Sequence, residues 1–144
     1  MKTMSAGQTE RLGAQMAAQF RAGDVVLLSG ELGAGKTVFT RGVARGFGVQ
    51  GHVVSPTFVL LRCYPGPIPL HHFDLYRLSD ADAFYGAGLA DFMGEEAVCL
   101  VEWPERCLDA MPACRLQVRI EYGPAEDERI ITVCREGGFR EVLL

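Results

Sequence analysis

Asparagine is absent from the 144 residues of the chain, and basic residues are scarce. Without asparagine, the chain lacks the Asn-Lys-x-Asp type of motif through which GTPases recognise guanine. The chain has 14 lysines and arginines against 18 acidic residues, which gives a formal net charge of −4. Because binding through nucleic-acid phosphates needs a surplus of basic residues on some face, this balance argues against a protein that holds nucleic acid by bulk electrostatics.

Long apolar runs are also missing. The N-terminal stretch MKTMSAGQTERLGAQ lacks the apolar region of a signal peptide, and no later stretch is apolar for long enough to cross a bilayer. We therefore expect a cytoplasmic protein without a membrane partner.

The five cysteines show no C-x-x-C spacing. The sequence therefore predicts neither a disulfide framework nor a zinc knuckle. Cys63, Cys99 and Cys134 lie in apolar or β-patterned stretches, where a reduced thiol is usually buried. We expect these three side chains to be buried and assign them no chemistry.

The composition is that of a folded protein. Hydrophobic residues make up 49% of the chain and charged residues 22%, with no long polar tract. A chain of 144 residues can bury one core and is too short for two ordinary domains. We predict a single domain over residues 1–144.

A glycine-rich motif lies in the first third of the chain, in SGELGAGKTVFTRG, residues 29–42. It fits G-x-x-x-x-G-K-[ST], the spacing of a phosphate-binding P-loop. We expect the backbone N–H groups of residues 31–37 to surround a polyphosphate, Lys36 to reach its β and γ oxygens, and the Thr37 hydroxyl to bind Mg²⁺. The motif positions are Gly30, Gly35, Lys36 and Thr37.

The flanking residues place this loop between a strand and a helix. DVVLLSG (24–30) is a short apolar run that ends at the first loop glycine, which is typical of a strand buried on both faces. VFTRGVARGFG (38–48) has helical spacing, although Gly42 weakens it. The apolar spacing and a following glycine predict an earlier helix over residues 9–22.

Further strands are predicted in the second half. FVLLRCY (58–64) and LHHFDLY (70–76) flank PGPIP, which indicates two strands joined by a proline-rich turn. AVCLVEW (97–103) predicts another buried strand, and residues 80–93 predict a helix broken at its glycines.

The last two patterned segments, RLQVRIEY (115–122) and RIITVCRE (129–136), predict an antiparallel hairpin at the edge of the sheet. The order of elements predicts an α/β fold of the P-loop NTPase type. We expect a mostly parallel central sheet, flanked by helices, with the antiparallel C-terminal hairpin added to it.

Two acidic residues end predicted strands. Glu102 ends the apolar run VCLV, and Asp74 follows LHHF. A carboxylate at the end of a buried strand is costly unless it emerges at the ligand-binding edge of the sheet. Either residue can hold Mg²⁺ or its waters, or position an attacking water, as P-loop enzymes require.

Three features allow two interpretations each. His72 is either a zinc ligand or, as we favour, a structural or hydrogen-bonding residue, because its neighbour His71 faces the other way along a strand. Trp103 either packs or stacks on a base or guanidinium group. SPTF, residues 55–58, is either a Ser-Pro turn or a mobile loop whose hydroxyls close on Mg²⁺ or the γ-phosphate.

Four segments, in this order, resemble the TsaE family, also called YjeE: GELGAGKTVFTRG, VVSPTFVLLRCY, HFDLYRL and CLVEWPE. The resemblance covers roughly residues 9–135 and is far more specific than the P-loop alone. It implies a P-loop ATPase that uses ATP/ADP and Mg²⁺ and is needed for the threonylcarbamoyladenosine modification of tRNA. TsaD- and TsaB-like partners are implied, of which TsaD transfers the threonylcarbamoyl group, and tRNA is met only indirectly through the complex.

The resemblance also implies roles for individual residues. Lys36, Asp74 and Glu102 form the catalytic set, and Thr37 and Glu102 are the Mg²⁺ ligands, directly or through water. Asp74 is an acid of the active site that orients a metal-bound or attacking water. The segment 55–58 corresponds to a switch-like loop.

Two family positions lie outside the main motifs: Thr9 matches one close to the adenine, and Arg129 matches a basic residue near the nucleotide. The loop departs from the family at Glu31, where Asp is usual, and at Val38, where a second Thr is usual. Loss of that hydroxyl predicts weakened rather than abolished binding. The predicted nucleotide-binding residues are Thr9, Glu31, Leu32, Gly33, Ala34, Gly35, Lys36, Thr37, Val38 and Arg129.

Other function classes also use a P-loop. A nucleoside or small-molecule kinase needs an acceptor pocket and normally a lid with catalytic arginines, and no arginine-rich lid insertion is visible. A GTPase is disfavoured by the missing asparagine, and DFMG (91–94) spells D-x-x-G without following a buried strand. A nucleotide-gated scaffold overlaps with the main interpretation, because an isolated P-loop domain without an arginine finger hydrolyses slowly.

Overall fold

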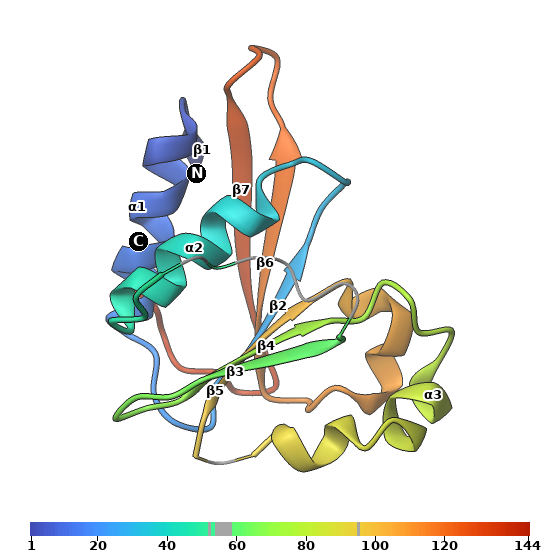
Figure 1. The fold of residues 1–144 in the computed structure, drawn as a ribbon. Coiled ribbons are helices and arrows are strands. Elements are labelled where there is room, and N and C mark those ends of the chain that lie inside the picture. The colour runs from blue at the N-terminus through green and yellow to red at the C-terminus, as the bar shows by residue number, and fades with distance from the viewer. Residues whose placement is uncertain (52, 54–58, 95) are drawn as a thin grey trace.

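The computed structural model describes residues 1–51, 53, 59–94 and 96–144, in which seven strands form one sheet (Figure 1). The strands are β1 (Lys2–Thr3), β2 (Val25–Ser29), β3 (Leu61–Tyr64), β4 (Leu70–Asp74), β5 (Val98–Glu102), β6 (Arg115–Tyr122) and β7 (Arg129–Glu136). The α-helices are α1 (Ala6–Ala17), α2 (Lys36–Gly46) and α3 (Ala81–Gly86), and the 3-10 helices are η1 (Leu89–Phe92) and η2 (Pro104–Ala110).

The spatial order of the strands is β1-β7-β6-β2-β5-β4-β3. The four central strands, β6, β2, β5 and β4, run parallel to one another, and antiparallel pairs flank them on both sides. This arrangement confirms the expected α/β fold with a mostly parallel centre and a C-terminal hairpin. The hairpin lies one strand inside the edge, because the two-residue strand β1 pairs with β7; so short a strand leaves no periodic pattern in the sequence.

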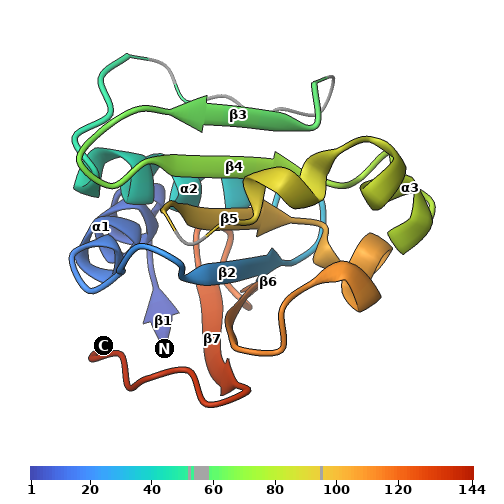
Figure 2. The same cartoon turned by 90° about the horizontal axis from the view of Figure 1, so that it is seen from below.

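Each face of the sheet is covered by its own helices. Along β2, Val26 and Leu28 pack into a core with α1 and α2, whereas Val25 and Leu27 pack with α3, η1 and η2. Figures 1 and 2 show α1 and α2 side by side, with α3 at the opposite side of the sheet. Burial on both faces explains why this strand reads as a continuous apolar run.

The pairing of α1 with α2 depends on two glycines. A Cβ atom on Gly42 would lie 1.9 Å from the carbonyl oxygen of Glu10, and one on Gly13 would lie 2.4 Å from that of Phe39. The two helices therefore approach more closely than any larger side chain allows. Gly42, which weakens the helical pattern of the sequence, is required by packing.

Helix boundaries differ from the prediction by a few residues. The helix predicted over residues 9–22 spans Ala6–Ala17, because Ser5 accepts a hydrogen bond from the backbone of Gln8 and starts the helix earlier. The break expected within residues 80–93 is confirmed, since α3 ends at Gly86 and η1 starts at Leu89.

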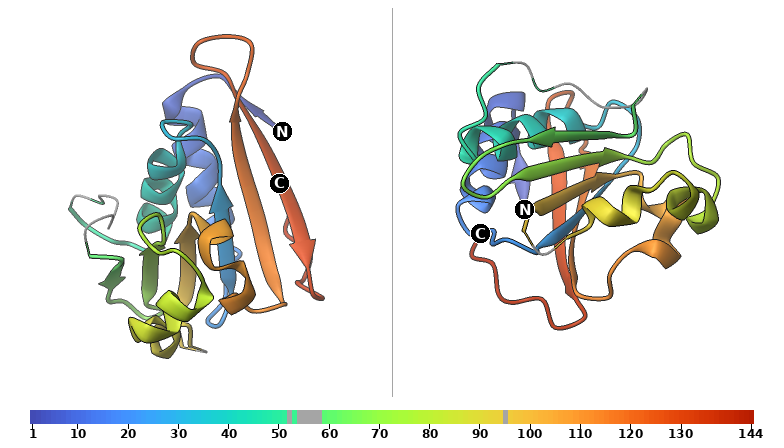
Figure 3. Two further views of the ribbon diagram at one scale, coloured as in Figure 1. Left: turned by 90° about the vertical axis from the view of Figure 1, so that its right-hand side faces the viewer. Right: turned by 60° about the horizontal axis from the view of Figure 1, so that its bottom comes forward.

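Two of the three cysteines expected to be buried are exposed. Cys99 on β5 is buried as predicted, whereas Cys63 and Cys134 are exposed. Cys63 lies on the edge strand β3. On β7, Ile131 and Val133 pack with the core of α1 and α2, so Cys134, the next residue, lies on the opposite face. Figure 3 shows no helix of the described chain over that face. An alternating pattern predicts a strand but not which of its faces is covered. None of the described helices is long and apolar enough to cross a membrane.

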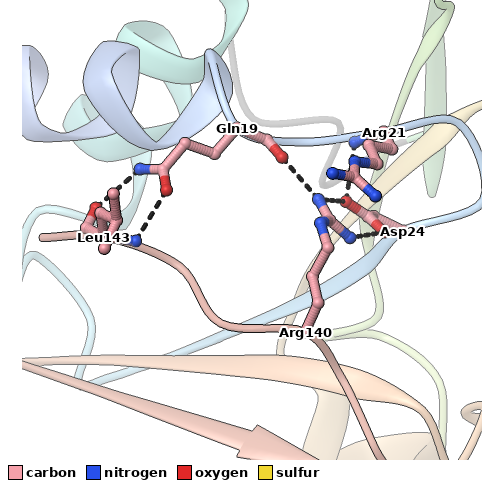
Figure 4. A network of polar contacts seen from close by, with 5 residues as sticks. All are labelled: Gln19, Arg21, Asp24, Arg140 and Leu143. Atoms are coloured by element: carbon pink, nitrogen blue, oxygen red, sulfur yellow. Dashed lines mark hydrogen bonds and ion pairs between the residues drawn. The ribbon is translucent and has the colours of Figure 1, made fainter.

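The C-terminal segment, residues 137–144, runs from β7 back toward α1 (Figure 2). Arg140 donates hydrogen bonds to both carboxylate oxygens of Asp24, each at 2.7 Å, at the amino end of β2. The side-chain amide of Gln19 exchanges two hydrogen bonds with the backbone of Leu143, at 2.6 and 2.7 Å (Figure 4). Phe139 is buried in the core under this segment, so the chain end is fixed by both apolar and polar contacts.

Candidate nucleotide-binding site

The glycine-rich loop connects the carboxyl end of β2 to α2 and touches the neighbouring strand β6. A Cβ atom on Gly30 would lie 2.3 Å from the carbonyl oxygen of Ile120, so glycine is required at that approach. Gly35, the residue before α2, has a φ of 110° and gives the helix no side-chain cap. By contrast, Ser5 and Asp80 cap the other two α-helices. The first N–H groups of α2 are therefore available to an anion, which the helix dipole also favours.

The C-terminal hairpin holds this loop from one side. Tyr122 Oη donates a hydrogen bond to the carbonyl of Leu32 at 3.0 Å, and Arg129 Nε donates one to the carbonyl of Ala34 at 2.9 Å. The guanidinium group of Arg129 also lies 4.7 Å from the centre of the Tyr122 ring. These contacts bind two loop carbonyls to the hairpin, and they explain how strands far apart in sequence fix the shape of the loop.

Lys36 is 5% exposed although it carries a charged group. Its Nζ donates a hydrogen bond to the carbonyl of Gly30 at 2.7 Å and lies 3.5 Å from the centre of the Trp103 ring. Burial lowers the pKa of Lys36, while the nearby carboxylates of Glu102, Glu105 and Asp74 oppose that shift. The ring of Trp103 therefore lies against the lysine ammonium, a partner that neither of the two interpretations named.

The two predicted carboxylates lie side by side at the same sheet edge. Asp74 and Glu102 are register partners in the parallel pair of β4 and β5, and each is 2% exposed. Asp74 Oδ1 accepts a hydrogen bond from the backbone of Tyr76 at 3.0 Å. Glu102 Oε2 lies 2.6 Å from Nε2 of His72. Buried carboxylates are costly unless they have partners of this kind.

A cavity of about 400 Å³ joins the loop to these carboxylates. The four residues predicted to be catalytic or to bind Mg²⁺, Lys36, Thr37, Asp74 and Glu102, share its wall. Two carboxylates and one hydroxyl are oxygen donors of the kind that Mg²⁺ accepts beside phosphates and water, so the residues fit this ion. The full lining is Leu32, Gly33, Gly35, Lys36, Thr37, Val38, Asp74, Tyr76, Glu102 and Trp103.

A smaller cavity of about 110 Å³ also borders the loop and shares Gly33, Gly35 and Val38 with the larger one. Thr9 and Arg129 both line it, so the fold brings them beside the loop. The Thr9 hydroxyl is itself bonded to the hydroxyl of Thr3 at 2.7 Å. Asp127 and Ala6 complete the lining.

Two predicted loop residues line neither cavity. Glu31 lines a separate cavity of about 550 Å³, formed by β2, β6 and η2, and Ala34 is buried in the core. Only their backbone can contribute to the site. The predicted segment 55–58 lies outside the described residues.

The hydrogen-bonding role favoured for His72 is confirmed, although its partner Glu102 was not predicted, and two further contributors to this site were missed. Tyr76 lines the larger cavity, and Asp127 lines the smaller one. Tyr76 and Asp127 lie within two residues of predicted site residues, which is the only signal that the sequence offered. The contact of His72 joins two strands and becomes visible only in the sheet.

A central strand that leads through a glycine-rich loop into an uncapped helix, with carboxylates on the next strands, defines an α/β protein of the P-loop NTPase type. Comparison with known proteins narrows this class. The family described as "Threonylcarbamoyl adenosine biosynthesis protein TsaE" matches residues 3–131. The chain belongs to the TsaE family, as its motifs predicted.

Individual relatives agree with this assignment. The tRNA threonylcarbamoyladenosine biosynthesis protein TsaE of Bacillus subtilis is 39% identical over 143 residues, covering 99% of this chain and 89% of the relative. The protein of the same name from Streptomyces coelicolor is 47% identical over 130 residues, which cover 85% of this chain and 86% of the relative. The crystal structure of Bacillus subtilis YdiB matches with a TM-score of 0.82 and 36% identity, over 95% of this chain and 84% of that one.

Proposed function

We propose that this protein binds and hydrolyses Mg·ATP, and that hydrolysis supports turnover of the complex that installs threonylcarbamoyladenosine on tRNA. The observation that carries the ATPase part is the cavity in which the open amino end of α2, Lys36 and two register-paired carboxylates meet. The names of the relatives support the tRNA-modification part. A protein acting in this pathway is expected in the cytoplasm.

Each residue of the cavity has a role that follows from its chemistry. The N–H groups of residues 31–37 bind phosphate oxygens, and Lys36 turns from the Gly30 carbonyl toward the β and γ oxygens. Thr37 and Glu102 hold Mg²⁺, directly or through water, and the ion when bound offsets charge on the phosphates. Asp74 orients the attacking water. The water attacks the γ-phosphorus, the bond from that phosphorus to the β–γ bridging oxygen breaks, and ADP and inorganic phosphate leave.

The smaller cavity is suited to the base end of the nucleotide. It shares Gly33 and Val38 with the larger cavity, and Thr9 and Arg129 also line it. The absence of asparagine supports adenine over guanine as the base. Val38 offers only its backbone N–H where a hydroxyl would add a phosphate contact, so we expect binding that is weaker but not lost.

Hydrolysis is proposed to be slow until partners bind. In the part of the chain that the structure describes, no arginine lines the larger cavity, and Lys36 is its one basic residue. An arginine finger supplied by another protein raises phosphoryl-transfer rates by about 10³ to 10⁵. TsaD- and TsaB-like proteins are the proposed partners, and tRNA is reached through them.

The test is ATP hydrolysis by the purified protein, alone and with the TsaD and TsaB proteins of the same organism, with GTP as the nucleotide control. We expect slow turnover alone and Mg²⁺-dependent stimulation with partners. Lys36→Ala should abolish nucleotide binding, whereas Glu102→Ala should spare much of the affinity and remove turnover. Lys2→Ala, which changes the only other lysine, serves as the control.

The outcomes separate the parts of the proposal. ATP binding without association or stimulation would refute the tRNA-modification part and would favour a kinase or a scaffold. Acceleration of ADP formation by an acceptor molecule would identify the kinase. Equal loss of affinity and turnover in the Lys36 and Glu102 variants would refute their separate roles.

A further inference from the structure

His72 lies behind the carboxylate that faces the larger cavity. It is two residues before Asp74 on β4, on the same face of the strand, and is fully buried at 0% exposure. Its register partner on β5 is Leu100, two residues before Glu102. His72 does not line the cavity itself. Its connection to the cavity runs through Glu102, at 2.6 Å from Nε2 to Oε2.

Only one of the two ring nitrogens of His72 has a hydrogen-bond partner among the described residues. Within the described residues, Nδ1 of His72 is buried and has no hydrogen-bond partner. Most buried side-chain polar atoms have at least one hydrogen-bond partner, so the unpaired Nδ1 is a cost that needs an explanation other than packing. Among the described residues, the ring makes its polar contact with Glu102, and that contact is short enough to be charge-assisted. A ring with its proton on Nε2 donates to the carboxylate.

We propose that His72 is a positioning residue for Glu102: its Nε2–H holds Oε2 of the carboxylate and thereby presents the other oxygen, Oε1, as the oxygen donor for Mg²⁺. This inference rests on the proposed Mg·ATP site. The arrangement reverses the common one, in which a carboxylate orients a metal-binding histidine from behind. Without the ring, the carboxylate is free to rotate, and the donor is no longer fixed.

The test uses Mn²⁺ as the probe ion and measures its binding to the full chain with ADP by electron paramagnetic resonance. ADP binding in EDTA is measured in parallel by calorimetry. We expect His72→Asn, whose amide is too short to reach Glu102, to weaken Mn²⁺ binding by about 10-fold or more, as loss of such orienting groups does. ADP affinity in EDTA should stay within about twofold, since His72 does not line the cavity.

Three controls make this result specific. His72→Gln places an amide near the position of Nε2 and should restore most of the Mn²⁺ affinity. His71→Asn changes the adjacent histidine, whose Nδ1 instead contacts the carbonyl of Phe92 at 2.8 Å, and should leave binding unchanged. In a Glu102→Gln background, His72→Asn should cause no further loss of Mn²⁺ affinity, because the two residues act as one unit.

Each other outcome contradicts the proposal in a recognisable way. Wild-type Mn²⁺ affinity in the folded His72→Asn variant, or an equal loss of ADP affinity in EDTA, would refute the positioning role while leaving the proposed function in place. Failure of wild-type protein to bind Mn²⁺ with ADP would refute the metal site and this inference together. If His72→Asn does not fold, the result for His72→Gln decides, since loss of Mn²⁺ affinity in that folded variant would also refute the role.

Discussion

The two ends of strand β2 differ in how their buried charged side chains are partnered. At its amino end, Asp24 accepts two hydrogen bonds from Arg140 and a third from the backbone of Arg21, all at 2.7 Å. At its carboxyl end, the ammonium group of Lys36 is buried against a backbone carbonyl and an aromatic ring, beside two buried carboxylates. One end pairs its charges within the chain, whereas the other gathers them around a cavity.

This contrast separates stability from function within one sheet. Paired charges and a fixed chain end contribute to the free energy of unfolding, while buried charges gathered around a cavity reduce it and are retained where a ligand needs them. Substitutions at the amino end should therefore lower stability and leave nucleotide binding unchanged. Substitutions at the carboxyl end should weaken nucleotide binding and leave stability nearly unchanged.

The largest expected effect is on nucleotide binding, from Lys36→Ala. Loss of its charge should abolish detectable ATP binding, a loss of about 100-fold or more, since hydrogen bonds to phosphate from a charged group are strong. The free energy of unfolding without nucleotide should change by less than about 1 kcal/mol, because the penalty of burying the ammonium group offsets its contacts. Calorimetry and urea unfolding measure the two quantities. A large loss of stability with modest loss of affinity would reverse the contrast.

A substitution at the contact between α1 and α2 should lower the stability of the whole domain. Gly42→Ala places a Cβ atom 1.9 Å from the carbonyl of Glu10, so α1 and α2 must separate. We expect destabilisation of about 2–3 kcal/mol, despite the helix preference of alanine. Gly7→Ala, whose Cβ atom would find its nearest atoms at 3.8 Å, is the control and should be neutral or stabilising. Thermal unfolding of both variants checks the difference, and equal stability would show that the helices do not meet this closely.

At the amino end, Arg140→Ala should cost about 2 kcal/mol of stability and leave ATP affinity unchanged within about twofold. The reason is that Asp24, at 9% exposure, would lose both charge-assisted hydrogen bonds. Urea unfolding beside ATP titration checks the pair of expectations. Arg135→Ala, at an exposed position on β7, is the control. Weakened ATP binding in the folded Arg140 variant would show that the two ends are coupled.

The smallest effect is expected from Gln19→Ala, which removes the two hydrogen bonds to the backbone of Leu143. Both bonds are exposed, so we expect a loss of about 0.5–1.5 kcal/mol. Hydrogen exchange of the amides of residues 141–144 should accelerate more than global unfolding explains. Unchanged exchange there would mean that Phe139 alone fixes the chain end.

Features that depend on local sequence patterns were predicted better than contacts between segments that are distant in the sequence. The bounds of β6 and β7, the strand before the glycine-rich loop and the shared edge of Asp74 and Glu102 all follow from local patterns and are confirmed in the structure. Alternation and loop spacing are local properties, so a single sequence contains them.

Features that join distant segments were missed or predicted wrongly. The prediction that Cys63 and Cys134 are buried was wrong, because burial depends on which strand faces are covered by helices. Gly42 lowers helix propensity in isolation, yet the approach of α1 requires it. The contact between His72 and Glu102 joins two strands separated by 30 positions. Tertiary packing overrides local preference in each case.

The most direct test of the nucleotide site is calorimetric titration of the isolated wild-type protein with ATP, in Mg²⁺ and in EDTA. The proposed site predicts saturable binding at one site per chain, tighter in Mg²⁺, and lost in the Lys36→Ala variant but kept in the Arg140→Ala variant. Absence of binding at millimolar ATP, or binding that survives Lys36→Ala unchanged, would contradict a nucleotide site at the carboxyl end of β2.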